Sequence, residues 1–166
     1  EPSLGVHHLT HDITPYNTFE ASYRLFQTVE YWPEGTTFVS VVDPGVGSSR
    51  KSVVALTKTG QYIVTPDNGT LSYIKKVVGI EAVREISEVE NRRSNTELSY
   101  TFHGRDVYAY TGAKLSSGHI SFEEVGPELP VDKILELPVV ETIIEDNLVR
   151  GAIDILDIRF GSLWTS

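Results

Sequence analysis

An acid and an arginine flank a glycine-rich loop in the first third of the chain. The apolar run from Thr37 to Val42 ends in Asp43, and Arg50 follows shortly before a second apolar run opens at Ser52. A buried strand would carry the carboxylate into the loop, and the loop would return the guanidinium beside it. The backbone N–H groups of Gly45-Val46-Gly47 can converge as an anion-binding nest. Together these groups can hold a small anion or an activated water.

Two plainer interpretations of this loop stay open. Asp-Pro-Gly is ordinary turn chemistry, and an Asp–Arg pair often does no more than close a loop. A phosphate-binding loop fits less well, because that pattern needs Gly-Lys-Ser/Thr leading into a helix. Here Lys51 follows Arg50 and opens a strand-like run.

Histidines supply the second candidate chemistry. His103 stands at the expected start of a helix in Phe-His-Gly-Arg-Asp, and a side chain that titrates near neutrality suits proton transfer. Capping or packing is the alternative role. His7, His8 and His11 form a cluster, but no Glu accompanies them as in His-Glu-x-x-His, so no metal site is expected.

Two further side chains are candidates by position. Tyr16 follows Thr14-Pro15 at the expected start of a helix, where an aromatic ring either packs or stacks on a flat ligand. Asp157 interrupts a strand-like run, where a charge can also serve to discourage edge-to-edge aggregation.

Composition bounds the class of protein. The chain has 166 residues, 40% of them hydrophobic, which is enough for one domain or one domain and a piece of another. Its net charge of -9 argues against a nucleic-acid partner. It has no cysteine for disulfides or thiolate metal sites, and no apolar run approaches the ~20 residues of a membrane span. A cytoplasmic location is the default expectation.

The elements that must position these side chains are read from hydrophobic periodicity and turn residues. The sequence predicts strands over 6–9, 37–42, 52–57, 62–65 and 82–86, and helices from Thr14-Pro15 to about Glu30, over 71–78 and over 107–115. A polar loop or lid is predicted over 88–99. Strands are predicted again over 139–144 and 151–158, without a helix between them.

This order predicts an α/β N-terminal domain, a layered sheet with flanking helices, over residues 1–137. The start of an all-β, barrel-like domain is predicted over residues 138–166. The chain has no Met, begins Glu1-Pro2-Ser3 and stops inside an apolar stretch. We therefore expect residues to be missing at both ends.

Four segments in order resemble one family, the S-adenosyl-L-methionine (SAM) hydrolases, or SAM hydroxide adenosyltransferases, which are related to fluorinases and chlorinases. The segments are Asp12-Ile13-Thr14-Pro15-Tyr16, Val41-Val42-Asp43-Pro44-Gly45-Val46-Gly47, Pro66-Asp67-Asn68-Gly69 and Phe102-His103-Gly104-Arg105-Asp106. The resemblance runs through nearly the whole chain, and the combination is more specific than any one piece.

The resemblance implies a catalytic triad of Asp43, Arg50 and His103 around the attacking water. The halogenating relatives carry an aromatic residue at the Asp position and a small hydroxyl residue at the His position, so this chain has the hydrolytic pair. The family has an opening Asp-Phe-Gly-type strand that supplies a ribose-binding acid, and this chain lacks it.

The resemblance also implies substrate-binding residues outside the triad. Tyr16 matches an aromatic that packs on the ribose, and Val46 matches a residue that lines the nucleophile pocket. Asp157 is similar to the acid that binds the methionine amino group. Ser162 aligns with a side-chain amide that touches adenine in the fluorinases.

The implied reaction is attack of water on the ribose C5′ of SAM, which yields adenosine and L-methionine. SAM is then the substrate, and no further cofactor is expected. The family also implies a homotrimer with sites between the α/β domain of one subunit and the barrel domain of the next. A halide-using SAM adenosyltransferase and a non-catalytic SAM- or adenosine-binding module are the alternatives.

Overall fold

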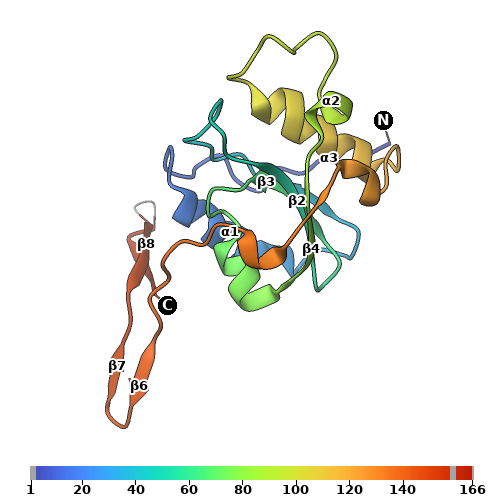
Figure 1. Cartoon of the computed structure of the whole chain (residues 1–166). Coiled ribbons are helices and arrows are strands. Elements are labelled where there is room, and N and C mark those ends of the chain that lie inside the picture. The colour runs from blue at the N-terminus through green and yellow to red at the C-terminus, as the bar shows by residue number, and fades with distance from the viewer. Residues whose placement is uncertain (1–2, 158–159, 166) are drawn as a thin grey trace. The chain divides into compact units, whose positions relative to one another are not determined.

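A five-stranded sheet with strand order β1-β3-β2-β4-β5 lies at the centre of the first of two units (Figure 1). The computed structural model describes residues 3–157 and 160–165, and the chain forms the units Glu1–Glu136 and Leu137–Ser166. The strands of the sheet are β1 (Thr37–Val39), β2 (Ser52–Thr57), β3 (Tyr62–Pro66), β4 (Ile80–Glu85) and β5 (Glu128–Leu129). β1 and β3 run parallel, and the other neighbouring pairs are antiparallel. The predicted α/β layer is therefore a mixed sheet.

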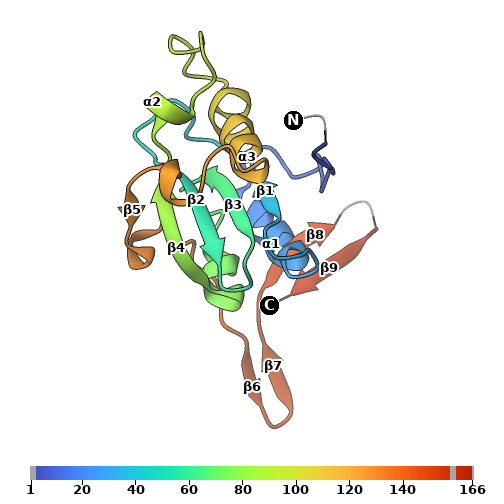
Figure 2. The same cartoon turned by 90° about the vertical axis from the view of Figure 1, so that its right-hand side faces the viewer.

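Helices and helical turns cover both faces of this sheet (Figure 2). They are α1 (Thr18–Val29), the π-helical turns η1 (Ile74–Val78) and η2 (Gly104–Tyr108), α2 (Glu88–Asn91), α3 (Ala109–Ser116), and the 3-10 turns η3 (Glu123–Val125) and η4 (Val131–Lys133). Successive side chains of a strand point to opposite faces. Val53 of β2 accordingly packs in one apolar cluster with Leu25 of α1, whereas Val54 packs in another with Leu115 of α3. The layered sheet predicted from the sequence is confirmed in this form.

The α1 helix begins later than its sequence pattern suggested. A start at Thr14-Pro15 was predicted, but Tyr16 has a φ of 68°, a left-handed conformation that no α-helix continues. Asn17 is the N-cap instead, and its side chain accepts a hydrogen bond from the Glu20 N–H at 3.0 Å. The Glu20 carboxylate in turn accepts from the Thr14 N–H at 3.0 Å, which fixes the chain entering the helix.

Two strand predictions at the start of the chain are wrong in part or in whole. Residues 6–9 form no strand, and the side chain of Val6 is exposed. The predicted strand over 37–42 ends its ladder at Val39, although the Ser40 N–H still donates to the Val64 carbonyl at 3.0 Å. Apolar patterning was present in both segments, but a strand also needs a neighbouring backbone, which the described residues do not offer to residues 6–9.

The other elements of this unit follow their predictions closely. The β2–β3 hairpin is confirmed, with the Thr57 N–H bonded to the Gln61 carbonyl at 2.9 Å across its turn. The helix predicted over 71–78 is a π-helical turn from Ile74 to Val78, and it ends at Gly79, whose φ of 87° suits glycine. The helix predicted over 107–115 is preceded by the η2 turn, so the helical segment opens at Gly104.

The second unit consists of two hairpins. β6 (Ile143–Glu145) pairs with β7 (Leu148–Arg150), and β8 (Ile153–Asp157) pairs with β9 (Ser162–Thr165), both antiparallel. Strands without an intervening helix were predicted here. The sequence predicted two strands, over 139–144 and 151–158, whereas the structure has four shorter strands with different ends. The described residues form no closed barrel, and a barrel-like domain remains a prediction.

Gly112 allows α3 to approach β1 closely. A Cβ at this position would lie 2.7 Å from Cγ2 of Val39, a branched side chain with little rotational freedom. We expect Gly112→Ala to lower the free energy of unfolding by about 1 kcal/mol or more, because overpacking at ~1–3 kcal/mol outweighs the ~1 kcal/mol helix preference for alanine. Thermal unfolding measures this change. In a Val39→Ala background the same substitution should become neutral or stabilising, and a stabilising Gly112→Ala in the native background would contradict the argument.

Candidate functional site

Asp43 follows β1 by four residues, and the turn after β3 holds this part of the chain in place. Beyond β1 the chain stays extended, and the Asn68 Nδ2 donates to the Val42 carbonyl at 2.8 Å. The Asn68 Oδ1 accepts from the Thr70 hydroxyl at 2.7 Å, which fixes the amide with its nitrogen toward Val42. The turn after β3 therefore positions the residue that precedes Asp43.

Asp43, Arg50 and His103 come together around one guanidinium. The Arg50 Nε donates to Asp43 Oδ1 at 2.9 Å, and the Arg50 Nη2 donates to the other carboxylate oxygen. The same Nη2 lies 3.0 Å from His103 Nδ1. The Arg50 and Asp43 side chains are only 9% and 5% exposed, and His103 is 5% exposed. The three predicted residues thus form one buried group, in which Arg50 joins the other two.

Ser52 and Tyr108 support Arg50 from behind. The Arg50 Nη1 donates to the Ser52 hydroxyl oxygen at 2.9 Å, which lies 3.1 Å from the hydroxyl of the fully buried Tyr108. The guanidinium carbon lies 5.5 Å from the centre of the Tyr108 ring, a favourable cation–π distance. Burial raises the pKa of Tyr108, so its phenol stays protonated, and on this side Arg50 contacts neutral groups.

His103 is held in its neutral form. Burial, the largest cause, lowers the pKa of His103 below its ordinary value. The carboxylate of Glu88 opposes this effect, and the cations Arg50 and Arg92 reinforce it, while Asp43 opposes it more weakly. A neutral imidazole has one electron pair, which can accept a hydrogen bond, as from Arg50 here, or a proton.

The glycine-rich loop differs from the nest expected over residues 45–47. The Val46 N–H points to the Asp43 carbonyl at 3.4 Å, and the Ser48 N–H donates to the Gly45 carbonyl at 3.0 Å. The Ser48 hydroxyl also donates to that carbonyl at 2.6 Å. These N–H groups close the loop on itself, so Val46 does not offer its N–H to an anion in this arrangement. What the loop supplies is the tight turn, with Gly47 at a φ of 78°, that returns the chain to Arg50.

Asn68→Asp tests the contact that positions Asp43. The substitution replaces the donor to the Val42 carbonyl with a carboxylate oxygen, so two acceptors face each other. We expect a loss of about 1–3 kcal/mol in the free energy of unfolding, measured by urea denaturation. Asn147→Asp, on an exposed hairpin turn, makes the same chemical change and should lower it by no more than about 0.5 kcal/mol. Equal effects at the two sites would show that the Asn68 contact carries no special weight.

Of the four residues predicted to bind substrate outside the triad, two belong to the first unit and two to the second. Tyr16 is 73% exposed before α1, and Val46 is 38% exposed in the loop after Asp43. Asp157 ends β8 and Ser162 opens β9, where the two are cross-strand partners in the second unit. The structure therefore pairs Asp157 with Ser162, and their roles remain predictions.

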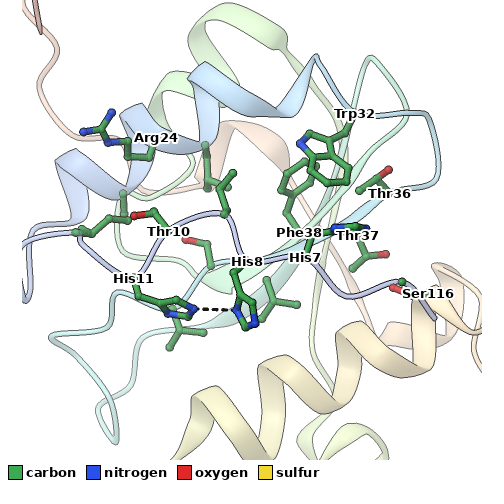
Figure 3. Close-up of a pocket in the computed structure, with 18 of the residues that line it drawn as sticks. His7, His8, Thr10, His11, Arg24, Trp32, Thr36, Thr37, Phe38 and Ser116 are labelled. Atoms are coloured by element: carbon green, nitrogen blue, oxygen red, sulfur yellow. Dashed lines mark hydrogen bonds between the residues drawn. The ribbon is translucent and has the colours of Figure 1, made fainter. Parts of the chain in front are cut away.

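A cavity of about 770 Å³ is lined by the N-terminal segment and by β1 with the residues that follow it, up to Val42 (Figure 3). His7, His8 and His11 line it together with Trp32 and Phe38, and His8 Nδ1 lies 2.9 Å from His11 Nε2. Asp43, Arg50 and His103 are not among its lining residues. We place the candidate active site at the triad, because charged and proton-transferring side chains converge there.

The part of the chain that the structure describes contains neither a metal-binding cluster nor a membrane-spanning helix. Within residues 3–157 and 160–165, no three His, Cys, Asp or Glu side chains gather closely enough to hold a metal ion. None of the described helices has the length and apolar character needed to cross a membrane.

Sequence reasoning missed several residues around the site. Ser52 had a usable signal, since it follows Arg50 by two positions and so points to the same side of an extended chain. Asn68 and its partner Val42 both lay inside segments already singled out, but no local pattern indicated that the two residues contact each other. Tyr108 had no comparable signal, because it lies far from Arg50 in the sequence. Arg92 had none either, because it lies within a segment predicted to be a polar loop.

Comparison with known proteins gives a consistent picture. Residues 1–126 match the family described as the SAM hydroxide adenosyltransferase N-terminal domain. An (R)-S-adenosyl-L-methionine hydrolase from Methanocaldococcus jannaschii is 42% identical over 107 residues, which is 64% of this chain and 38% of that protein. One of the same name from Thermus thermophilus is 36% identical and covers 85% of this chain and 56% of its own length. The chain spans about half the length of these curated relatives.

A more distant relative and a solved structure are similar to nearly the whole chain. A fluorinase from Actinopolyspora mzabensis is 26% identical over 94% of this chain and 59% of its own length. The crystal structure of a conserved protein from Thermotoga maritima is 38% identical in sequence, with a TM-score of 0.90. That match covers 99% of this chain and 60% of the other.

Proposed function

Because the chain belongs to the SAM hydroxide adenosyltransferase family, we propose that it carries the catalytic triad of an enzyme that hydrolyses SAM to adenosine and L-methionine. The observation that carries this proposal is the buried group in which Arg50 joins Asp43 and His103. Relatives named (R)-S-adenosyl-L-methionine hydrolase, at 42% and 36% identity, also support it. A water or hydroxide would attack the ribose C5′, and the bond from C5′ to the sulfonium sulfur would break.

The chemistry explains why these residue types are needed. The sulfonium leaves as a neutral thioether, so no acid has to protonate it, and the difficulty lies in the nucleophile. Water has a pKa of about 15.7 when free. One guanidinium at ~4 Å contributes about 4 kcal/mol, or roughly three pKa units, at an effective dielectric of ~20. Arg50 alone is therefore too weak, the more so because Asp43 neutralises much of its charge.

A proton acceptor must then act as attack proceeds, and His103 takes that role in the proposal. Its lowered pKa keeps the imidazole neutral and able to accept a proton at physiological pH. Asp43 acts by holding Arg50, through two hydrogen bonds, with a guanidinium nitrogen toward His103. Asp43 thereby keeps the Arg50 guanidinium and the His103 imidazole next to each other.

Substrate binding is proposed for residues outside the triad. Tyr16 would pack on the ribose, and an exposed aromatic residue with a φ of 68° is the kind of strained feature that function maintains. Val46 would line the nucleophile pocket. Asp157 would bind the methionine ammonium, and Ser162 would lie near the adenine. We further propose a cytoplasmic homotrimer with sites shared between subunits, for which sedimentation of the intact protein is the direct measurement.

Incubation of the intact protein with SAM, followed by chromatography of the products, tests the proposed function. Adenosine and methionine in equal amounts are the expected products. Fluoride and chloride should be supplied in parallel, because a fluorinase is among the relatives. A halo-deoxyadenosine would identify a halide-using transferase instead, and SAM recovered unchanged would indicate a binding module.

A further inference from the structure

Arg92 reaches His103 from the segment that was predicted to be a loop or lid. Its side chain is 7% exposed, and its Nη2 lies 3.3 Å from His103 Nε2. The same nitrogen pairs with the carboxylate of Glu88 in α2. The Arg92 Nη1 donates to the carbonyls of Thr96 and Ser99, at 3.4 and 3.1 Å. Arg92 therefore connects the segment 88–102 to the ring of His103.

The ring of His103 thus lies between two guanidinium groups. Its Nδ1 faces Arg50 at 3.0 Å, and its Nε2 faces Arg92 at 3.3 Å. A guanidinium only donates hydrogen bonds, and a neutral imidazole has one N–H and one electron pair. One of the two contacts can therefore be a hydrogen bond at any time, and the shorter distance favours Nδ1 as the acceptor. A protonated ring would turn both of its N–H groups toward cations.

The two arginines are not equally fixed. Arg50 is held by Asp43, Ser52 and its position over Tyr108. The partners of Arg92 are the half-exposed Glu88 and two carbonyls of its own segment. That segment also carries the exposed Val89 and Leu98, but its backbone is anchored on both sides of Arg92. The fully buried Asn91 donates to the Val125 carbonyl at 2.9 Å, and the Arg93 N–H donates to the Asp106 carbonyl at 2.8 Å. Arg92 therefore finds its side-chain partners other than His103 within its own segment, whereas Arg50 has partners from outside its loop.

We propose that Arg92 is a positioning residue for the reaction proposed above: its guanidinium, carried by the segment 88–102, confines the His103 ring from the Nε2 side and keeps that ring unprotonated until the reaction delivers a proton to it. This inference rests on the proposed function only in assigning His103 a part in the reaction. The charged groups that face the ring are Arg50 and Asp43 from one side and Arg92 and Glu88 from the other. Glu88 moderates the effect of Arg92 because it is both a partner of that arginine and a negative charge near His103.

The direct test is a titration of the His103 ring in the intact protein, followed by ¹H–¹⁵N NMR of the imidazole nitrogens. In Arg92→Gln we expect the His103 pKa to rise by about one unit or more, because one of two adjacent cations is gone. Arg93→Gln is the matched control, since it removes the same charge from the next residue, which is exposed. It should shift the titration by no more than a few tenths of a unit. An unshifted Arg92→Gln, or an equal shift in Arg93→Gln, would overturn the proposal.

Two further variants test the direction of the His103 pKa shift, so the proposal can be tested even if Arg92→Gln fails to fold. Arg92→Lys keeps the charge and should hold the His103 pKa low while it loosens the segment 88–102, whose carbonyls lose a planar donor. Glu88→Gln should shift the His103 pKa in the direction opposite to Arg92→Gln, that is, downward. A rise in Glu88→Gln would argue against the arrangement.

The pH dependence of turnover gives a second readout, which would not change if Arg92 had only a structural role. If His103 must be neutral to accept a proton, turnover is lost as pH falls through its pKa, so Arg92→Gln should move the acid limb of the rate profile to higher pH. The NMR result does not depend on hydrolysis. A shifted titration in a protein that leaves SAM intact would support the positioning role and contradict the proposed function. Hydrolysis by a protein whose titration is unshifted in Arg92→Gln would do the reverse.

Discussion

Asp43→Ala is expected to lower the turnover of SAM by the intact protein about 10²–10⁴-fold while changing its SAM affinity much less. The carboxylate holds Arg50 through two hydrogen bonds and contacts His103 only through that arginine. Without it, Arg50 loses the orientation that points one nitrogen at the imidazole. Turnover and substrate affinity measured separately, by initial rates and by calorimetry, distinguish the two effects.

The control for this substitution is a matched acid elsewhere in the chain. Asp132 is 73% exposed and pairs with the neighbouring Lys133, so Asp132→Ala should leave both quantities unchanged. An Asp43→Ala protein with normal turnover and weakened SAM binding would reassign Asp43 to substrate binding. A loss of both, with a lowered melting temperature, would indicate that the carboxylate matters mainly for the fold of the loop.

Arg50→Met is expected to cost about 3–5 kcal/mol in the free energy of unfolding and to abolish measurable turnover. The substitution leaves the carboxylate of Asp43, which is 5% exposed, without its cation. It also removes the donor to Ser52 and the charge over Tyr108. Arg50→Lys should restore little of the turnover, because an ammonium lacks the planar fork that reaches all these partners at once.

A double substitution separates the buried charge from the fold. When Asp43→Asn accompanies Arg50→Met, no unpaired charge is buried, and stability should recover relative to Arg50→Met alone while turnover stays lost. Lys51→Met is the matched control, because Lys51 is 45% exposed and its pairing with Glu85 should be worth no more than about 1 kcal/mol. Urea denaturation of the four proteins measures this. A double variant that is less stable than Arg50→Met would contradict the assignment of the loss to an unpaired carboxylate.

Local patterns predicted the parts of this site that neighbouring residues determine. The apolar run before Asp43, the glycines after it and the strand that opens at Ser52 give the strand–loop–strand path by themselves. The convergence of His103 on this loop was inferred from a resemblance to a family, because no periodicity connects residues fifty positions apart. The observed contact runs through Arg50 rather than directly between His103 and Asp43.

The errors have a common physical origin. The strand expected over residues 6–9 had the right side chains, but pairing depends on which backbone lies alongside, and composition carries no such information. The start of α1 was misplaced because Tyr16 adopts a left-handed conformation that is rare outside glycine and asparagine. Arg92 was seen only as one charge in a polar loop, since its burial follows from contacts with Glu88 and His103 that form when the chain has folded.

The one parallel pair in the sheet bears on the order in which the site forms. β2 pairs with β3 in an antiparallel ladder, and these two strands need only a short turn between them. β1 must instead reach across to pair in parallel with β3, and such non-local contacts carry a larger loop-closure cost before they contribute. Asp43 extends from β1, whereas Arg50 leads into β2. The guanidinium is therefore expected to be anchored with the β2–β3 hairpin, and its carboxylate partner to arrive when β1 pairs with β3, so the site is completed after the hairpin has formed.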